Sequence, residues 1–380
     1  LFQQIELLGA PSWNCSFNIW DEDKKQATAW NGIKGGFGRP FKSNSSENVF
    51  LDFYKGGKKG EKLLIKEIGG TALENHYKYL SAVPGVGETL AELKAAGVVL
   101  PTFQIFHIAY FSQGYLMFIT YEPVPEFYEI FKRFAKVFEQ TYTRFLDLQK
   151  AEAQAKEAEI ELALERVRAR TMAMQKSDEL AEAASILFQQ LQQLGIHCYS
   201  SGFTIWDEDH DELISWMCNA DGSMNPPFRL PLADNSWHKE QYQSWKNKEE
   251  FAVKDFTGKA MQNHFQYLRS FPLLDEAFKK SIAAGHPMPK RQVHHVANFS
   301  LGNLLFISLE PCSESHEIFK RFAKVFDQTY TRFLDLQKAE AQTREAQINL
   351  AVERVRASAL AMFKSEEIID VVFKMKEEVM

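Results

Sequence analysis

The chain has 380 residues, 45% of them hydrophobic and 25% charged, a composition that fits a protein with buried cores and excludes a disordered or fibrous one. Lys and Arg number 44 against 50 Asp and Glu, and the net charge of −6 argues against nucleic-acid binding, which needs a basic surface. No apolar run approaches the length of a membrane span, and no signal peptide is visible.

A repeat of about 188 residues organises the chain. The string FNIWDED at 17–23 recurs as FTIWDED at 203–209, an offset of 186, and residues 129–154 recur at 317–342 with one change, an offset of 188. A period this long indicates two duplicated domains, because solenoid repeats run to roughly 20–50 residues. The globular stretches between these matches differ at most positions, so we expect the helix to keep one role while the globular parts diverge. Recombination between the repeats is the alternative explanation.

The first globular unit is predicted to span residues 1–125. It begins with LFQQ rather than with Met, so we expect a fragment with a truncated N-terminal helix. Apolar patterning at 104–112 and 115–123 predicts a closing β-hairpin. The elements before this hairpin are expected in the same order as in the second unit.

A long connecting helix is predicted for residues 126–177. Neither Gly nor Pro occurs from 126 to 194 or after Pro311, and either stretch would be about 100 Å long if it were helical throughout. A break is expected near Ser177–Asp178, where the string KSDEL offers a helix N-cap. Two apolar seams with heptad spacing lie along the helix in different phases: Phe131, Phe134, Phe138, Thr141, Phe145 and Leu148, then Ile160, Leu164, Val167, Thr171 and Met174.

The two seams predict different partners. The Phe-rich first seam is expected to pack on its own globular unit, as a terminal helix that covers a sheet. A single helix cannot bury the second seam alone, so the part after about residue 150 is expected to pair with a second copy in a parallel homodimer. The phase slip motivates a hypothesis that binding to the globular units changes helix packing at 150–175 and 338–363.

The second globular unit is predicted for residues 178–311, followed by a long C-terminal helix at 312–380. Residues 178–194 are expected to form its first helix, which Gly195 ends. Patterning then predicts strands at 200–209, 212–222 and 228–234, a helix at 236–248, a strand at 249–258, helices at 259–270 and 273–285, and a hairpin at 291–300 and 303–311. Antiparallel strands with helices on their faces make an α+β sandwich.

This order of elements between long helices resembles a GAF domain. The strings ERVRARTMAMQKSDEL and TYTRFLDLQKAEAQ resemble those of bacterial multidomain sensor proteins, often histidine kinases. The resemblance covers the whole chain, as two GAF-like antiparallel-sheet sandwiches joined by long helices that act as coiled-coil signalling helices. A PAS domain would place three strands after its central helices, whereas two are predicted here. The resemblance implies a cytoplasmic signal-transduction protein with its output domain beyond the C-terminal helix.

Motifs for catalysis are absent from the sequence. It has no GxSxG, GxxxxGK[ST] or HExxH string and no GxGxxG after a strand, and the long helices carry no kinase-type His. The Lys- and Gly-rich loop at 55–62 has no counterpart in the second copy and is interpreted as solvated. Four scattered Cys residues without a CxxC pair predict neither a disulfide framework nor a zinc site, and they favour a reducing cytoplasm. We therefore expect no catalysis and no metal.

The residues with which GAF-like domains bind their ligands are largely absent from this sequence. The NKFDE string of the cyclic-nucleotide-binding members is absent. No Cys is paired with a following His as bilin attachment needs; Cys198 follows His197 and has no match in the first copy. The methionine-sulfoxide-reducing members need clustered Cys residues. The resemblance implies a cavity between the sheet and its covering helices, but the cofactor is unknown.

The candidate ligand-binding residues are aromatic and imidazole side chains that both copies retain: Trp30, His76, His107, Trp216, His264 and His295. The histidines have three alternative roles. They could be a buried, hydrogen-bonded pair that braces a helix to a strand, or could contact the polar group of a ligand. Metal binding is the third, with thin support because no Cys or carboxylate cluster accompanies the pair. An enzyme that uses His76 and His107 as acid–base groups is a further alternative.

The sequence thus predicts a tandem GAF-like sensory module of a cytoplasmic signal-transduction protein, without catalysis of its own. It would bind a small molecule or a partner and relay the event through dimeric helices to an output domain such as a histidine kinase. The alternative from another class is a dimerisation scaffold whose GAF-like units bind no ligand.

Overall fold

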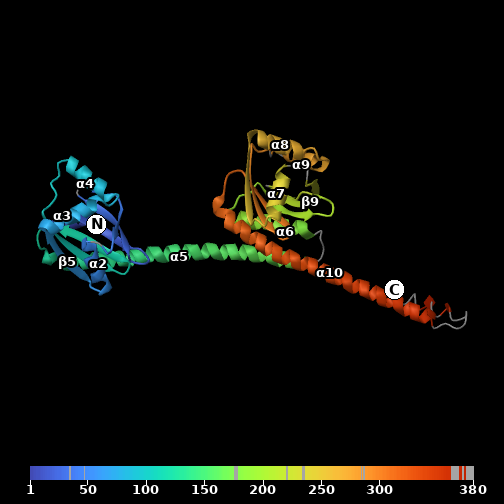
Figure 1. The fold of residues 1–380 in the computed structure, drawn as a ribbon, viewed down its shortest axis with the longest axis horizontal. Coiled ribbons are helices and arrows are strands. Elements are labelled where there is room, and N and C mark those ends of the chain that lie inside the picture. Colours follow the sequence, from blue (N-terminus) through green and yellow to red (C-terminus); the bar gives the residue numbers. More distant parts are fainter. Residues whose placement is uncertain are drawn as a thin grey trace. The chain divides into compact units, whose positions relative to one another are not determined.

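The described part of the chain forms two compact units. The computed structural model describes residues 1–33, 36–46, 48–174, 179–219, 221–232, 236–283, 285, 287–360, 368–369 and 372–373. The chain divides into unit 1, Leu1–Ala153, and unit 2, Gln154–Met380 (Figure 1). None of the described helices has the length and apolar character needed to cross a membrane.

Unit 1 is an antiparallel sheet with helices packed on it. Its elements are α1 (Phe2–Leu7), β1 (Ser12–Trp20), β2 (Gln26–Ile33), β3 (Gly36–Phe37), β4 (Phe41–Asn44), α2 (Asn48–Lys58), β5 (Leu63–Gly69), α3 (Gly70–Ser81), α4 (Val86–Ala95), β6 (Phe103–Phe111), β7 (Gly114–Thr120), the 3-10 turn η1 (Pro125–Phe127) and the first part of α5 (Tyr128–Met172). The sheet order is β3-β2-β1-β7-β6-β5, and β4 also pairs with β2.

Unit 2 repeats this arrangement after the second part of α5. Its elements are α6 (Leu180–Gln193), β8 (Ser200–Asp207), β9 (Glu212–Cys218), β10 (Phe228–Pro231), α7 (Ser236–Lys246), β11 (Phe251–Thr257), α8 (Gly258–Leu268), α9 (Pro272–Ala283), β12 (Arg291–Phe299), β13 (Gly302–Ser308), the 3-10 turn η3 (Ser313–Ser315) and α10 (His316–Leu360). The sheet order is β10-β9-β8-β13-β12-β11.

The predicted α+β class is confirmed: two antiparallel sheets with covering helices are joined by long helices. In each unit a strand and two helices precede a two-strand hairpin, formed by β6 and β7 or by β12 and β13. β7 and β13 begin at Gly114 and Gly302, where a Cβ atom would lie 1.8 Å from a carbonyl oxygen of the neighbouring strand. Glycine therefore permits the close approach of the two central strands in both copies.

The stretch from 126 to 194 is not one helix. α5 ends at Met172 and α6 begins at Leu180, while the predicted N-cap at Ser177–Asp178 lies outside the described residues. α6 ends at Gln193, and Gly195 has a φ of 74°, the left-handed conformation that glycine adopts most readily after a helix. The predicted end of this helix at Gly195 is therefore confirmed.

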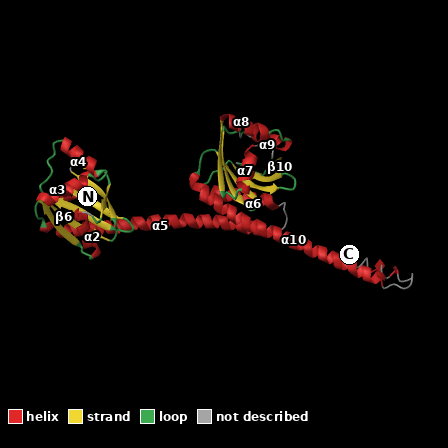
Figure 2. Cartoon of the chain, in the orientation of Figure 1, coloured by secondary structure: helices red, strands yellow, loops and turns green. Residues whose placement is uncertain are grey.

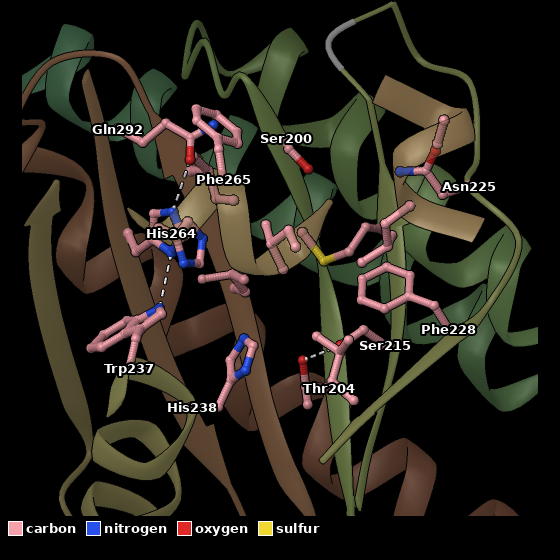
Figure 3. Close-up of a pocket in the computed structure, with 18 of the residues that line it drawn as sticks. Ser200, Thr204, Ser215, Asn225, Phe228, Trp237, His238, His264, Phe265 and Gln292 are labelled. Atoms are coloured by element: carbon pink, nitrogen blue, oxygen red, sulfur yellow. Dashed lines mark hydrogen bonds between the residues drawn. The ribbon is translucent and has the colours of Figure 1, made fainter. Parts of the chain in front are cut away.

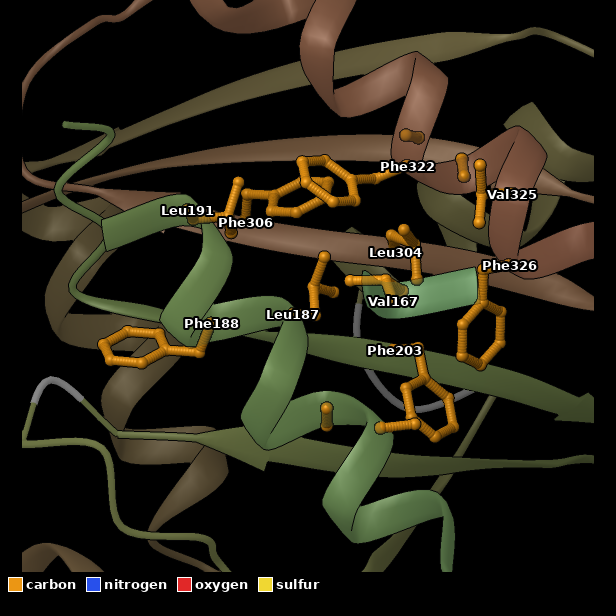
Figure 4. Close-up of a cluster of buried hydrophobic side chains, with 14 of the residues drawn as sticks. Val167, Leu187, Phe188, Leu191, Phe203, Leu304, Phe306, Phe322, Val325 and Phe326 are labelled. Atoms are coloured by element: carbon orange, nitrogen blue, oxygen red, sulfur yellow. The ribbon is translucent and has the colours of Figure 1, made fainter. Parts of the chain in front are cut away.

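Helices cover the sheet of unit 2 on both faces. The second part of α5, α6 and the first part of α10 lie along one face, and α7, α8 and α9 pack on the other (Figure 2). Figure 4 shows side chains of the first layer meeting those of the strands, including Val167 from α5, Leu187 from α6, Phe326 from α10 and Phe203 from β8. These residues form one continuous buried cluster.

The first helical seam packs on its own unit, as predicted, over only part of its length. Phe131 is fully buried and its ring stacks on that of Phe118 with 4.2 Å between centroids. Phe145 and Leu148 are 50% and 54% exposed. The seam is therefore covered near its start and open near its end.

The second seam is buried within unit 2. Ile160, Leu164, Val167, Thr171 and Met174 all have exposed fractions of 6% or less. Their cover comes from α6 and α10 of the same chain. This seam therefore does not require a second copy to bury it, and the parallel homodimer stays a prediction.

Two corresponding Phe positions in the repeated helices, Phe145 and Phe333, test this difference in burial. Replacing Phe333, which is 4% exposed, by Ala should lower the free energy of unfolding by about 3–5 kcal/mol, because a large cavity opens in the core. The same change at its repeat counterpart Phe145 should cost less than about 1 kcal/mol. Urea unfolding of both variants measures the difference, and equal losses would contradict it.

Candidate ligand cavity

A cavity lies between the sheet of unit 2 and the helices α7, α8 and α9. It holds about 950 Å³ of space not filled by atoms, its opening to solvent included. Apolar side chains form most of the wall, among them Met217, Phe228 and Phe278. Asn225 and Ala277 line both this cavity and a neighbouring hollow.

Three imidazoles lie in the lining of this cavity, and Figure 3 labels two of them, His238 and His264. His238 comes from α7, His264 from α8 and His294 from β12. The ring of His264 lies 5.3 Å from that of His294 and 6.4 Å from that of His238, measured between centroids. All three are buried, and the ring of Phe256 stacks on His264.

The hydrogen bonds of His294 define its tautomer. Trp237 donates from its indole Nε1 to His294 Nδ1 at 3.1 Å. Because an indole nitrogen can only donate, Nδ1 must be unprotonated and Nε2 must carry the proton. Nε2 then donates to the side-chain oxygen of Gln292, also at 3.1 Å. His294 is thus held as a neutral ring in one orientation.

Burial keeps the three imidazoles neutral. It lowers the pKa of His264 to about 4, and burial together with nearby His264 lowers that of His238 to about 3. The pKa of His294 lies well below its ordinary value, first through burial and then through the neighbouring imidazoles. Nδ1 of His264 is buried without a hydrogen-bond partner among the described residues. A bound molecule could supply that partner.

The rest of the polar lining is neutral as well. Thr204 and Ser215 share a buried hydrogen bond of 2.9 Å, and Asn219 and Asn225 hold each other through two bonds of 3.0 Å. Among the described lining residues there is no Asp, Glu, Lys or Arg. The cavity therefore offers hydrogen bonds without a fixed charge.

The imidazoles are not arranged as metal ligands. Across the described residues, no three His, Cys, Asp or Glu side chains are grouped closely enough to hold a metal ion. A fourth protein group of suitable chemistry is also absent from the described lining, which has no acidic residue and no Cys.

Unit 1 has a counterpart cavity with a different lining. It holds about 770 Å³ between the sheet and the helices α3 and α4. His76 corresponds to His264, but Phe50 and Phe106 stand where unit 2 has His238 and His294. The rings of Phe50 and Phe106 lie 5.8 and 5.7 Å from that of His76. Aromatic packing thus replaces the imidazole cluster.

Two further positions also have aromatic rings in unit 1 and polar side chains in unit 2. Phe53 and Tyr115, both fully buried in unit 1, occupy the positions of Gln241 and Asn303, which form a 3.4 Å hydrogen bond in unit 2. Buried amides cost free energy unless they are hydrogen-bonded, whereas the ring of Phe53 needs no such partner. This contrast singles out unit 2 as the candidate binding unit.

Of the six residues predicted from the repeat, His76 and His264 line the two cavities. His107 and His295 lie on the opposite face of the sheet, under the long helices. His107 is hydrogen-bonded to Thr120 at 2.8 Å. His295 is hydrogen-bonded to Ser308 at 2.9 Å. Because His76 and His107 point to opposite faces, they cannot act together as one acid–base pair.

Trp30 and Trp216 also lie away from the cavities. Their rings stack on Phe17 and Phe203, on the sheet face that the long helices cover. Trp216 is nearly buried there, whereas Trp30 is 38% exposed.

His295 has a thiol neighbour. Cys312 Sγ lies 3.3 Å from its Nε2. Burial raises the pKa of the Cys312 thiol, so the pair is a neutral thiol beside a neutral imidazole and lacks the thiolate of a nucleophile.

Sequence reasoning missed His238 and His294. The signal for His294 was present, since two adjacent histidines in a strand must point to opposite faces, which assigns His294 to the face opposite His295. For His238 no signal was available, because its counterpart is Phe50 and only the packing of α7 on the sheet brings it to the cavity.

Comparisons with known proteins add little. Neither a protein-family model nor a curated protein sequence matches this chain. Among solved structures, one similar chain is the bacteriophytochrome RpBphP3 from the photosynthetic bacterium R. palustris, at 11% identity and a TM-score of 0.33. The match covers 76% of this chain and 57% of that chain, so this chain spans little more than half of the phytochrome. A likeness of this degree assigns no function.

The buried imidazoles predict a loss of stability in mild acid. Their pKa values are about 6.5 when unfolded and lower when folded, so the unfolded state binds more protons as the pH falls from about 6.5 to about 4. The contribution of these histidines to the free energy of unfolding is fully present above pH 6.5. Below that pH it decreases by up to about 1.4 kcal/mol per pH unit for each histidine. His238→Phe should reduce the loss between pH 7 and pH 5 in urea unfolding. A His238→Phe chain that loses as much stability as the wild type between pH 7 and pH 5 would contradict the assignment.

Proposed function

We propose that this chain is a sensory module without catalysis of its own, and that unit 2 binds a small molecule in the cavity lined by His238, His264 and His294. The observation that carries the proposal is the contrast between copies. At the positions where unit 1 has Phe50 and Phe106, unit 2 has the buried imidazoles of His238 and His294, and a buried imidazole costs free energy unless hydrogen bonds compensate it. Nδ1 of the neighbouring His264 is buried without a partner among the described residues, and a ligand that bonds to it offsets part of this cost.

The lining defines the chemistry of the ligand. A molecule with a permanent charge would be buried beside no opposite charge, at a cost of several kcal/mol. Both ring nitrogens of His294 are already bonded to Trp237 and Gln292, whereas Nδ1 of the neutral His264 ring is buried without a partner among the described residues, so this part of the cavity suits a head group that forms a hydrogen bond. The apolar remainder of the wall, including Phe228 and Phe265, suits a flat or aromatic body. We therefore infer an uncharged ligand with a hydrogen-bonding head.

Strand β12 lies between the cavity and α10, and its side chains reach both. His294 faces the cavity, and its neighbour His295 faces the long helix, where its ring lies 5.1 Å from His316 and 5.4 Å from Phe319. A shift of β12 on binding would therefore press on the first turns of α10. In this proposal α10 relays binding to an output domain such as a histidine kinase, as the resemblance to GAF-containing sensors implies.

The alternative is a dimerisation scaffold whose units bind nothing. The exposed apolar residues of the later part of α10, such as Leu336 and Ile348, favour a role in association. Under this alternative the cavity of unit 2 holds only water, and the parallel homodimer predicted from the long helices is the function itself.

Matched neutral and ionised ring compounds test the binding proposal. In thermal unfolding of the full chain, neutral amides such as nicotinamide should raise Tm, whereas the corresponding carboxylates such as nicotinate should not. The double variant His238→Phe, His294→Phe, which imports the residues of unit 1, should lose the response. Gln104→Leu in the cavity of unit 1 is the control and should keep it.

Native mass spectrometry of the purified chain supplies the second measurement. A bound mass that the double variant lacks supports unit 2 as the binding unit. If no compound raises Tm and no mass is retained, the scaffold alternative is favoured.

A further inference from the structure

The cavity of unit 1 carries two amide side chains whose carbonyl oxygens are unpaired. Asn14 of β1 and Asn31 of β2 both line this cavity. Their Oδ1 atoms are buried and have no hydrogen-bond partner among the described residues. No other buried side-chain nitrogen or oxygen in the described lining is left in this state. A buried polar atom without a partner costs free energy, and a bound molecule that pairs with it removes the cost.

The two amides lie close together on one face of the sheet. Ser16 of β1 is paired with Asn31 of β2, so Asn14, two residues before Ser16, lies diagonally across from Asn31. Diagonal neighbours on one face of an antiparallel pair are about 7–8 Å apart, which lets one small molecule reach both. The helices over this face, α2, α3 and α4, also contribute side chains to the lining.

Unit 2 has no counterpart of this amide pair. The repeat counterpart of Asn14 is Ser200 and that of Asn31 is Met217, and both line the cavity of unit 2. Strand β12, which carries His294, corresponds to β6, and in the sheet of unit 1 β7 separates β6 from β1 and β2. The polar groups that distinguish the two cavities therefore lie over different strands.

Other polar residues in the lining of unit 1 are already engaged. Gln104 donates from its side-chain nitrogen to the hydroxyl of Tyr77 at 2.8 Å, and the hydroxyl of Thr89 donates to the backbone oxygen of Gly85 at 3.0 Å. Burial lowers the pKa of His76 to about 4, so its ring is neutral. The two amides are thus the groups that a ligand would complete.

The lining also excludes a charged ligand. Arg39 is the one charged residue in the described lining, and it pairs with Glu88 at 3.6 Å and with Glu92 at 3.3 Å. Its side chain is 61% exposed, so this charge is balanced at the surface. The wall is otherwise mostly apolar, with residues such as Phe41 and Met117. An ion in this cavity would meet no unpaired opposite charge among these residues.

We propose that the cavity of unit 1 is a second ligand site, which takes an uncharged molecule with an apolar body and two hydrogen-bond donors directed at Oδ1 of Asn14 and Oδ1 of Asn31. An amide carbonyl oxygen accepts hydrogen bonds and cannot donate them. The amino groups of an aromatic amine and the hydroxyl groups of a diol share this donor chemistry. Because unit 2 lacks the amide pair, the two units bind different molecules. The proposal does not depend on ligand binding in unit 2.

Three benzene derivatives of one shape test the donor requirement. 1,3-Diaminobenzene and 1,3-dihydroxybenzene each offer two donors and are uncharged at pH 7, whereas 1,3-dimethoxybenzene offers none. Saturation-transfer NMR with the full chain measures their affinities. The better of the two donor compounds should bind at least about tenfold more tightly than the dimethoxy compound, because only a donor satisfies the two oxygens. Which donor compound is the better one distinguishes an amine from a diol.

Variants that exchange residues between the copies locate the binding. The double variant Asn14→Ser, Asn31→Met imports the residues of unit 2 and should bind the better donor compound at least about tenfold more weakly. Asn31→Met alone should weaken binding less, because Asn14 is retained. His238→Phe, His294→Phe is the matched control in unit 2 and should bind the compound like the wild type. Circular dichroism checks that each variant folds.

Several results would overturn the proposal. Equal or tighter binding of the dimethoxy compound would do so, as would a failure of both donor compounds to bind. Unchanged affinity in the folded Asn14→Ser, Asn31→Met chain or in Asn31→Met alone would contradict it too. A loss of binding confined to the His238→Phe, His294→Phe chain would place the compounds in unit 2 and reject a site in unit 1.

Discussion

A stacked pair of Phe rings fixes the long helix to the sheet in each unit, and the arrangement of the unit depends on it. Phe118 stacks on Phe131, and Phe306 on Phe319, with 4.2 Å between centroids in both cases. All four rings are fully buried. Ring pairs of this kind add free energy beyond the area they bury, so the helix sits on the sheet in the same way in both copies. The helix-covered face is therefore the constant face of the repeat.

The opposite face has been free to change because it does not hold the long helix. In unit 1 it is packed with rings such as Phe53 and Phe106, while in unit 2 it carries imidazoles and amides. Strand β12 connects the two faces, since His294 and His295 are adjacent and point apart. The cavity of unit 2 is thus separated from α10 by the thickness of one strand.

Much of the fold could be predicted from the sequence, because repeats, periodicity and Gly positions are local signals. The closing hairpins, the helix ended by Gly195 and the packing of Phe131 on its own unit all follow from such signals. The candidate site was predicted only in part. His264 was found because both copies retain it, whereas His238 was missed because its role depends on how α7 packs, and His107 and His295 were placed in the ligand site although they face the long helices.

The sequence by itself determined two α+β units, their order of elements and the apolar seams of the long helices. Only the tertiary structure decided what each seam contacts. Val137 and Val325 have the same neighbours in sequence, and one is exposed while the other is buried. Burial is a property of what packs from outside the helix, and that cover comes from residues far away in the chain. For the same reason, only the folded sheet could bring the three imidazoles of α7, α8 and β12 to one cavity.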